Sequence, residues 1–504
     1  MAHTSFDMQA FHAQIDDALK KHFPPSSPPT LPHPSALARA AASLPKASDA
    51  LSKPLGVSAT TAHLLDDIVP ALSGQALSPR YYGFVTGSVH PAAQAAEAVV
   101  AALDQNVQVH LPDQTIATDV EASALDLLAD LLGLSHPQTG ARRGIFTGRT
   151  FTTGATGSNI LGLACAREHV LARRVPPGSP SVGELGILGA CVAAGVTDIQ
   201  VLTTMGHSSL SKAASVVGLG RASVKQMAKS PERPWLLDVD AVERELVARD
   251  GTGVATIIAV SAGEVNTGLF AAGKEDMKRL RELADRYGSW IHVDGGKWFP
   301  PYDCGMFFTR SLSTLTNVFT NPNAAYLASS AGAPIPSPLN VGLENSRRFR
   351  ALPAYAVLRS EGRKGMAAML GRMVELARRI ACFVRDSEHY DWLPNGEADV
   401  DDTHIIVLLR AKNLALNDEL VARINETRDM YVSGTSWGGQ KAVRVAIGSW
   451  RVDVERDFAV VEAILSAVAE GRPYAALSRR GIKYRDRIGR GVEQTDGTCS
   501  SAQP

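Results

Sequence analysis

The sequence predicts an α/β protein with a mostly parallel sheet, followed by a smaller α+β domain. Two observations predict this class. Between about residues 143 and 310, short apolar runs alternate with amphipathic helical stretches, as in βαβ units. After a long helical stretch at 360–387, apolar runs at 403–409 and 441–447 alternate with helical stretches at 415–426 and 453–469. A chain of 504 residues also exceeds one ordinary core, so more than one domain is expected.

The N-terminal part predicts helices joined by an extended arm. Apolar residues at helical spacing predict a helix over residues 7–22, and further helices are expected at 58–76 and 90–135. Residues 23–56 are rich in proline and serine, which is typical of an arm with one short helical stretch that packs on a partner or on the main body.

The alternating region supplies the expected strands and helices of the sheet. We predict strands at 144–147, 199–203, 255–260 and 290–293. The helices between them are predicted at 157–172, 208–217, 238–249 and 273–287. The domain boundaries that follow are an N-terminal helix and arm at 1–75, a large domain at 76–345, a small domain at 346–475 and a disordered tail at 476–504.

Composition excludes several classes of partner. Lys+Arg and Asp+Glu both number 51, so no overall charge favours nucleic acid or an anionic membrane. The five cysteines are scattered without a CxxC pair, which argues against disulfides or a zinc site and suits a reducing compartment. The first ten residues lack a signal pattern, and no apolar run reaches the length of a membrane span. We therefore expect a cytoplasmic protein without a bound metal.

Lys297 is the most informative single residue. It follows a run of bulky apolar residues that ends in Asp294 and two glycines, and it precedes Trp298. A lysine with apolar neighbours has a lowered pKa and can react with an aldehyde such as pyridoxal phosphate. An acid near the ring nitrogen makes that cofactor a better electron sink. A lysine in a plain loop after a buried strand explains the same residues equally well.

A second candidate is a phosphate site at residues 151–159, with the sequence Phe-Thr-Thr-Gly-Ala-Thr-Gly-Ser-Asn. These small and hydroxyl residues lead into a helical run at 160–170. Backbone N–H groups and the helix dipole favour an anion at such a helix start. An ordinary Ser/Asn helix cap is the alternative.

Three other segments have weaker signals. His207 follows an apolar strand and opens a helix, so it could lie against an aromatic cofactor ring, although a capping or core role is commoner. Residues 261–268 form either a ligand loop at the end of a parallel strand or a plain turn. Arg347, Arg348 and Arg350 could clamp a carboxylate or phosphate, or form a solvated basic helix face.

Taken in order, these segments resemble the pyridoxal phosphate-dependent (group II) decarboxylases, relatives of the aromatic amino acid, glutamate and histidine decarboxylases. The resemblance runs from about residue 60 to 470. Its matching segments are 78–87, 104–112, 153–159, 207–213, 261–268, 292–294, 296–298, 323–326 and 346–350.

The resemblance implies a fold-type I transferase fold with a large doubly wound domain, a small C-terminal domain and a homodimer. Lys297 matches the lysine that forms a Schiff base with pyridoxal 5′-phosphate, and His207 matches the histidine that stacks on the ring. Asp294 matches the acid that pairs with the ring nitrogen. The other implied cofactor-binding positions form the phosphate turn and the end of the loop near the ring: Ala155, Thr156, Gly157 and Thr267. Residues 80–84 resemble the segment that shapes the substrate entrance.

The main departure from the family lies at the lysine. Asp294 and Lys297 are three residues apart, where the family has a few dozen residues and a connecting segment. Side chains at odd separations on an extended strand point to opposite faces, so a sharp turn at the intervening glycines is needed. Either one parallel strand is missing or the sheet is repaired locally. An incorrectly spliced gene model would also give such a sequence.

Two smaller departures concern chemistry near the cofactor. Gly296 stands where the family usually has histidine. The stretch at 331–340 lacks the tyrosine that protonates the product carbanion in aromatic amino acid decarboxylases. The proton donor therefore has to be another group.

The function predicted from the resemblance is decarboxylation of an L-amino acid to the amine and CO2 through an imine of Lys297. The chain would be a carboxy-lyase of amino acid and carboxylic acid metabolism. The alternatives are an oxidative, aldehyde-forming relative and an inactive or mis-spliced decarboxylase-like fold. Aromatic, acidic and small amino acids all remain possible substrates, and no nucleic acid or membrane partner is expected.

Overall fold

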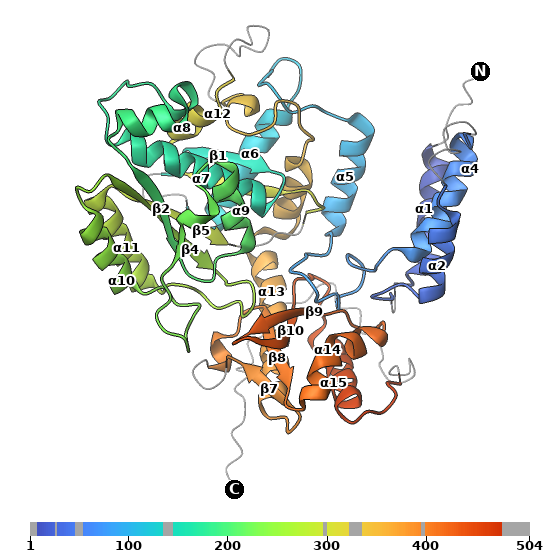
Figure 1. Cartoon of the computed structure of the whole chain (residues 1–504). Helices are drawn as coiled ribbons and strands as arrows, with labels where there is room; N and C mark the ends of the chain where they lie inside the picture. The colour runs from blue at the N-terminus through green and yellow to red at the C-terminus, as the bar shows by residue number, and fades with distance from the viewer. Residues whose placement is uncertain are drawn as a thin grey trace.

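The computed structural model describes residues 8–25, 28–45, 54–134, 145–295, 300–321, 335–394 and 399–475. Figure 1 shows an N-terminal group of helices beside a large α/β body, with a second, smaller sheet below it. Lys297 and Gly296 lie outside the described residues, as do residues 331–334 of the stretch that lacks a tyrosine.

The described N-terminal residues up to Ala71, called the arm from here on, form a group of short helices that pack on one another. They are α1 (Met8–His22), α2 (Pro34–Ser43), α4 (Gly56–His63), the π-helical turn η1 (Leu64–Ile68) and the 3-10 turn η2 (Val69–Ala71). His33 caps α2 by accepting from the amide of Ser35, and Pro34 occupies the first helical position. The predicted helix at 7–22 is confirmed. In Figure 1 the arm stands apart from the body.

A four-stranded parallel sheet forms the centre of the large body. Its strand order is β3 (Val224–Gln226), β2 (Asp198–Thr203), β4 (Val254–Ala262) and β5 (Trp290–Gly295). Three of the four predicted strands lie in this sheet, and the predicted mostly parallel arrangement is confirmed. Because all four strands run the same way, their carboxyl ends meet at one edge.

Helices cover both faces of this sheet. Alternate residues of β4 show it: Ile257 and Ala259 pack with one set of helices, whereas Ile258 and Val260 pack with the other. The first set is α7 (Ala155–Ala172), α8 (Val182–Ala193) and α9 (Ser208–Val216). The second set is α10 (Val239–Arg249) and α11 (Lys274–Tyr287). The sheet is therefore doubly wound, as the family resemblance implied.

A separate two-stranded antiparallel sheet pairs β1 (Gly148–Thr152) with β6 (Gly305–Thr309). The prediction of a strand at 144–147 was wrong, because the strand begins at Gly148 and runs to Thr152. Phe151 is buried against a cluster of helical side chains, and Thr150 and Thr152 are buried as well. The polar character of these residues concealed the strand, since the apolar pair just before it looked more strand-like.

The parallel sheet ends at β5 and does not continue into β6. Within the described residues, β5 pairs only with β4, and β6 pairs only with β1. Helix α7 packs against both β5 and β6 and so joins the two sheets. A further parallel strand would need a crossover of about a dozen residues or more, and Gly295 and Gly305 are too close in sequence to include one. The described part of the sheet is thus interrupted where the sequence departs from the family, without repair by direct pairing.

The remaining elements are the second sheet and the other helices of both parts of the molecule. The long helix α13 (Ala351–Arg385) has a non-helical residue at Gly362 and leads into an antiparallel sheet. The sheet order is β7 (Tyr390–Leu393), β8 (Ile406–Ala411), β10 (Gln440–Ala446) and β9 (Ser433–Trp437). The other helices are α5 (Pro91–Leu103), α6 (Ala117–Leu131), η3 (Arg221–Ser223), α12 (Leu312–Phe319), η5 (Pro338–Asn340), η6 (Val400–Asp402), α14 (Leu414–Glu426) and α15 (Val454–Ala469).

Two searches of the described residues gave negative results. None of their helices combines the length and apolar character needed to cross a lipid bilayer. They also contain no group of three or more His, Cys, Asp or Glu side chains that could hold a metal ion.

Candidate active site

The N-terminus of α7 has no side-chain cap among the described residues. Gly154 precedes the helix with φ of 143°, a conformation that favours glycine. The hydroxyl of Thr152 donates to the carbonyl of Gly154 at 3.0 Å, and Ser158 ties the turn to β6 by donating to the carbonyl of Met306 at 2.9 Å. The Ser/Asn-cap alternative is therefore wrong, and the amides of residues 155–157 face a site that suits a phosphate.

His207 begins α9 as its N-cap residue. Its Nδ1 accepts from the amide of Ser209 at 3.1 Å and lies 2.6 Å from the Ser209 hydroxyl. His207 is nevertheless exposed, and the capping contacts engage only Nδ1 of its two ring nitrogens. The capping role and a role against a ligand are compatible in this geometry.

Asp294 lies at the carboxyl end of β5 and is half-buried. Its Oδ2 accepts from the side-chain nitrogen Nδ2 of Asn159 at 3.0 Å, and Nδ2 also donates to the Ser209 hydroxyl at 2.9 Å. His292 Nε2 lies 2.7 Å from the amide oxygen of Asn159. Burial lowers the pKa of His292, while the nearby Asp294 opposes that shift. One buried asparagine therefore connects the acid with the serine beside His207.

Glu264 organises the loop at residues 261–268. Its carboxylate accepts from the amides of Asn266 and Thr267 at 2.7 and 2.8 Å, and from the Thr267 hydroxyl at 2.9 Å. Burial raises the pKa of Glu264, and these hydrogen bonds act in the opposite direction. The segment is therefore an ordered turn in which Thr267 is buried, at the strand edge where ligands bind in α/β proteins.

Arg444, which sequence reasoning missed, links the second sheet to the site region. From β10 it donates to the carbonyl of Val265 at 2.8 Å and to the carbonyl of Gly83 at 2.9 Å. Its burial lowers its pKa, with Glu264 acting in the opposite direction. The sequence signal for Arg444 was its position as a single arginine among the apolar residues of a strand. A charge buried in such a strand needs hydrogen-bond partners, which marks the residue as one with long-range contacts.

The segment at 80–84, expected to shape the substrate entrance, is anchored at its start. Arg80 is buried and donates to Asp457 at 2.9 Å and to the carbonyl of Asp429 at 2.9 Å. The rings of Tyr81 and Tyr431 lie in contact, with centroids 4.7 Å apart. Phe84 at the other end remains 50% exposed. The segment is thus fixed to the second sheet and presents an aromatic side chain to solvent.

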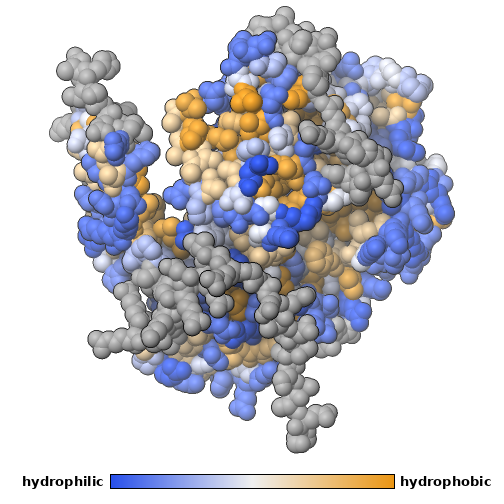
Figure 2. All heavy atoms as spheres, turned by 180° about the vertical axis from the view of Figure 1, so that it is seen from behind, coloured by the Kyte–Doolittle hydropathy of each residue, from blue (hydrophilic) through white to orange (hydrophobic). Residues whose placement is uncertain are grey.

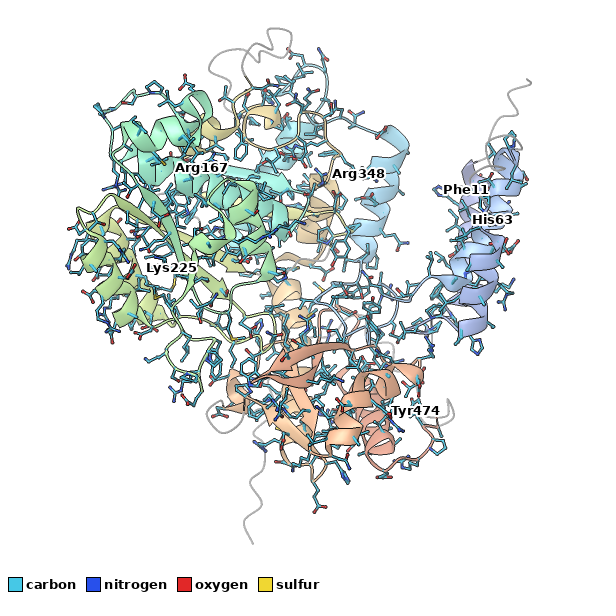
Figure 3. The ribbon with its side chains drawn as sticks, viewed as in Figure 1. Phe11, His63, Arg167, Lys225, Arg348 and Tyr474 are labelled. Carbon is cyan, nitrogen blue, oxygen red and sulfur yellow. The ribbon has the colours of Figure 1, made fainter. Side chains whose placement is uncertain are left out.

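The arginine cluster is occupied by internal ion pairs. Arg347 pairs with Glu121 of α6 in a buried contact, and Arg350 pairs with Asp303 at 3.0 Å. The more exposed Arg348 pairs with Glu97 of α5, the helix beside which Figure 3 shows it. The interpretation as a solvated basic face was wrong for Arg347, and these pairs favour a structural role over clamping of a ligand carboxylate.

The sequence that contains these site residues is similar to known proteins. Residues 77–299 match the model of the pyridoxal-dependent decarboxylase conserved domain. This segment of the chain is therefore similar to pyridoxal-dependent decarboxylases. The predicted cofactor, pyridoxal phosphate, and the predicted class of enzyme, a lyase, are thereby confirmed.

The individual relatives are distant in sequence, but they align with most of the chain. L-2,4-diaminobutyrate decarboxylase of Acinetobacter baumannii is 25% identical over 375 residues, covering 66% of this chain and 69% of the relative. Tryptophan decarboxylase 1 of Oryza sativa subsp. japonica is 25% identical over 438 residues, covering 77% and 80%. A crystal structure of Oryza sativa TDC with PLP and tryptamine has a TM-score of 0.75 at 21% identity, covering 94% of this chain and 100% of that one. The fold-type I architecture is therefore confirmed.

The described residues fit pyridoxal phosphate as the cofactor. An uncapped helix start suits its phosphate, a half-buried carboxylate suits a protonated ring nitrogen, and an exposed imidazole suits stacking on a ring. These features come from α7, β5 and α9, and Asn159 bonds directly to the latter two.

Proposed function

We propose that this protein decarboxylates an L-amino acid to the corresponding amine and CO2. The observation that carries the proposal is the hydrogen-bonded link from Asp294 through Asn159 to Ser209 beside His207, next to the open start of α7. This supports one site for a group that has a phosphate, an aromatic ring and a ring nitrogen. In the reaction the Cα–carboxylate bond breaks, CO2 leaves, and Cα takes up one proton.

Each residue has a defined task in this proposal. Bound pyridoxal phosphate supplies an electron sink for the electron pair of the broken bond. The amides of Ala155, Thr156 and Gly157 bind the phosphate, and Asp294 holds the proton on the ring nitrogen. His207 restricts the ring from one face, and Lys297, matched by sequence, attaches the cofactor covalently. Thr267 borders the ring from the ordered loop.

A homodimer is the assembly that we propose for this enzyme. The arm within residues 1–75 exposes large apolar side chains, among them Val57 at 63% and Leu64 at 46%. Figure 2 shows apolar surface on the side of the arm that faces the body, and α5 exposes Val99 and Leu103. Exposed apolar surface of this kind marks an interface, and a second copy of the chain would cover both surfaces.

The dimer proposal is tested by light scattering after size-exclusion chromatography. The double variant Val57→Asp/Leu64→Asp should yield monomers, because two charges would be buried at the interface. Leu188→Asp is the control, since Leu188 is 80% exposed on α8, outside the arm. A wild-type monomer would refute the dimer. We also assign the enzyme to the cytoplasm, because five scattered cysteines without a CxxC pair suit a reducing compartment.

The activity is tested by adding pyridoxal phosphate to the purified chain. We expect a visible absorption band, and after borohydride reduction the cofactor should be recovered on the peptide that contains Lys297. Lys297→Ala should lose both signals, whereas Lys274→Ala, at an exposed lysine that begins α11, should keep them. Amine and CO2 are the expected products, and aldehyde with ammonia and peroxide would indicate the oxidative alternative. A wild-type chain that stays colourless and traps no cofactor would refute the proposal.

A further inference from the structure

Two buried polar side chains, Asn159 and Ser209, connect the two groups that would contact the cofactor ring, and a third, His292, bonds to Asn159. Asn159 is 1% exposed, Ser209 4% and His292 6%. Asp294 and His207, which stand at the ends of this connection, are half-buried and exposed, respectively. Buried polar groups in a fold need hydrogen-bond partners, and a fully satisfied network specifies one arrangement.

Asn159 has both donors and its acceptor engaged. Its side-chain nitrogen donates to Asp294 Oδ2 at 3.0 Å and to Ser209 Oγ at 2.9 Å. Its oxygen lies 2.7 Å from His292 Nε2 and accepts from it. A flipped amide would bring the oxygen against the carboxylate of Asp294, which is repulsive, so the amide has one orientation.

The direction of the hydrogen bonds continues from Asn159 to His207. Because the Ser209 hydroxyl accepts from Asn159, its own hydrogen can point to His207 Nδ1, 2.6 Å away. The amide of Ser209 donates to the same nitrogen at 3.1 Å. With Nδ1 accepting twice, a neutral imidazole carries its proton on Nε2, and the orientation of the ring is set by Ser209.

His292 fixes the other side of Asn159. A Cβ at position 162 would lie 2.4 Å from Cε1 and 2.5 Å from Nδ1 of His292, so a glycine in α7 makes room for this ring. Burial lowers the pKa of His292, which keeps the imidazole neutral and a donor through Nε2. The buried part of the network therefore has no net charge, and its charge lies at Asp294.

We propose that Asn159 is a positioning residue that fixes the carboxylate of Asp294 and the imidazole of His207 in one mutual arrangement. This inference rests on the proposed function, since both end groups act on the cofactor. Asn159 itself acts through its neighbours. Its loss changes two contacts of the cofactor ring together, one at the ring nitrogen and one at the ring face.

A purely structural role for Asn159 makes a different prediction, because the same bonds also tie α7 to β5 and α9. The variants that separate the two roles are Asn159→Ala, Asn159→Asp and the exchange Asn159→Asp/Asp294→Asn. The exchange keeps one carboxylate and one amide in the buried network but moves the charge away from the end of β5. Asn417→Ala is the matched control, because Asn417 is 8% exposed and bonds to Ala411 and Lys441 in the second sheet.

The measurements are the pyridoxal phosphate dissociation constant, the position and pH dependence of the visible band, and the urea midpoint without cofactor. We expect Asn159→Ala and Asn159→Asp to weaken cofactor binding about ten- to hundred-fold and to shift the band, because a charge-assisted contact is misplaced. Asn159→Asp should have a lowered urea midpoint, since two carboxylates then lie side by side. The exchange should recover the urea midpoint but not the band, and Asn417→Ala should lower only the urea midpoint.

Three outcomes overturn the inference, and they differ in what they mean for the proposed function. If the Asn159 variants lower the urea midpoint like Asn417→Ala while cofactor affinity and band stay as in the wild type, Asn159 is only structural and the proposed function stands. Asn159 is likewise only structural if the exchange restores the band together with stability. If the wild type itself binds no cofactor, the proposed function fails and this inference fails with it.

Discussion

Replacing Arg347 by methionine should be among the most destabilising single changes in this protein. The side chains of Arg347 and Glu121 are 2% and 7% exposed, and they pair with each other between α6 and the segment that leads into α13. The backbone of Arg347 is held separately, by its amide donating to Asn106 Oδ1 at 3.0 Å and by its carbonyl accepting from Val107 at 3.0 Å. The substitution keeps these backbone bonds, so its effect comes from the side chain alone.

The size of the effect follows from the burial of the partner. Methionine fills similar volume but leaves the carboxylate of Glu121 buried without a counter-charge, which costs about 3–5 kcal/mol of the free energy of unfolding. The neighbouring Arg348 gives the matched comparison. Its pair with Glu97 is 42% and 30% exposed, so Arg348→Gln should cost about 0–1 kcal/mol.

Urea unfolding followed by circular dichroism measures both variants under the same conditions. The double variant Arg347→Met/Glu121→Leu should recover most of the lost stability, because removing both charges avoids the unpaired carboxylate. If Arg347→Met unfolds at the same urea concentration as Arg348→Gln, the assignment of a buried structural ion pair is refuted. A role for Arg347 in binding a ligand carboxylate would then regain support.

Three further changes test the packing and the pH dependence. Gly162→Ala should lower the free energy of unfolding by about 1–3 kcal/mol, because the new methyl group displaces the ring of His292; a wild-type urea midpoint would contradict that packing. Gly371→Ala, at an exposed position in α13 with nothing within 4 Å of the new methyl group, should instead stabilise by about 0.4–1 kcal/mol, and a lowered midpoint would contradict this. Burial, with smaller contributions from two arginines, lowers the pKa of His169 from 6.5 to about 4. The unfolded chain therefore takes up this proton first, and stability should fall as the pH drops from 6.5 towards about 4. His169→Gln should reduce that slope in urea midpoints measured across this range, and an unchanged slope would exclude His169 as a source.

Local patterns in the sequence were sufficient for the long elements of the fold. Strands β2, β4 and β5 are apolar runs between amphipathic helices, and both features are visible without any partner. The strands β3, β6, β7 and β9 are short or polar and owe their conformation to pairing with neighbours. Helix α8 was not predicted either, and Gly186 has a positive φ of 69° inside it.

The site, like the fold, has features that local sequence predicts and features that depend on long-range contacts. The sequence placed an acid at the end of β5 and an imidazole at the start of α9, because strand ends and helix starts are local features. Their link through Asn159 depends on how α7 lies against β5, which no local pattern specifies. The ion pair of Arg347 with Glu121 has no local sequence signal, because the two residues lie 226 positions apart in the chain.

The interruption between β5 and β6 makes this edge of β5 a region that should open easily. Val293 of β5 is 50% exposed, and α7 packs against both strands that border the interruption. A border strand has main-chain groups without partners, and regions with few partners open at low free energy. In hydrogen exchange, the β5 amides that do not bond to β4 should therefore lose protection well before those inside β4. Local unfolding would then begin at β5, the strand that carries Asp294, before the outer helices unfold.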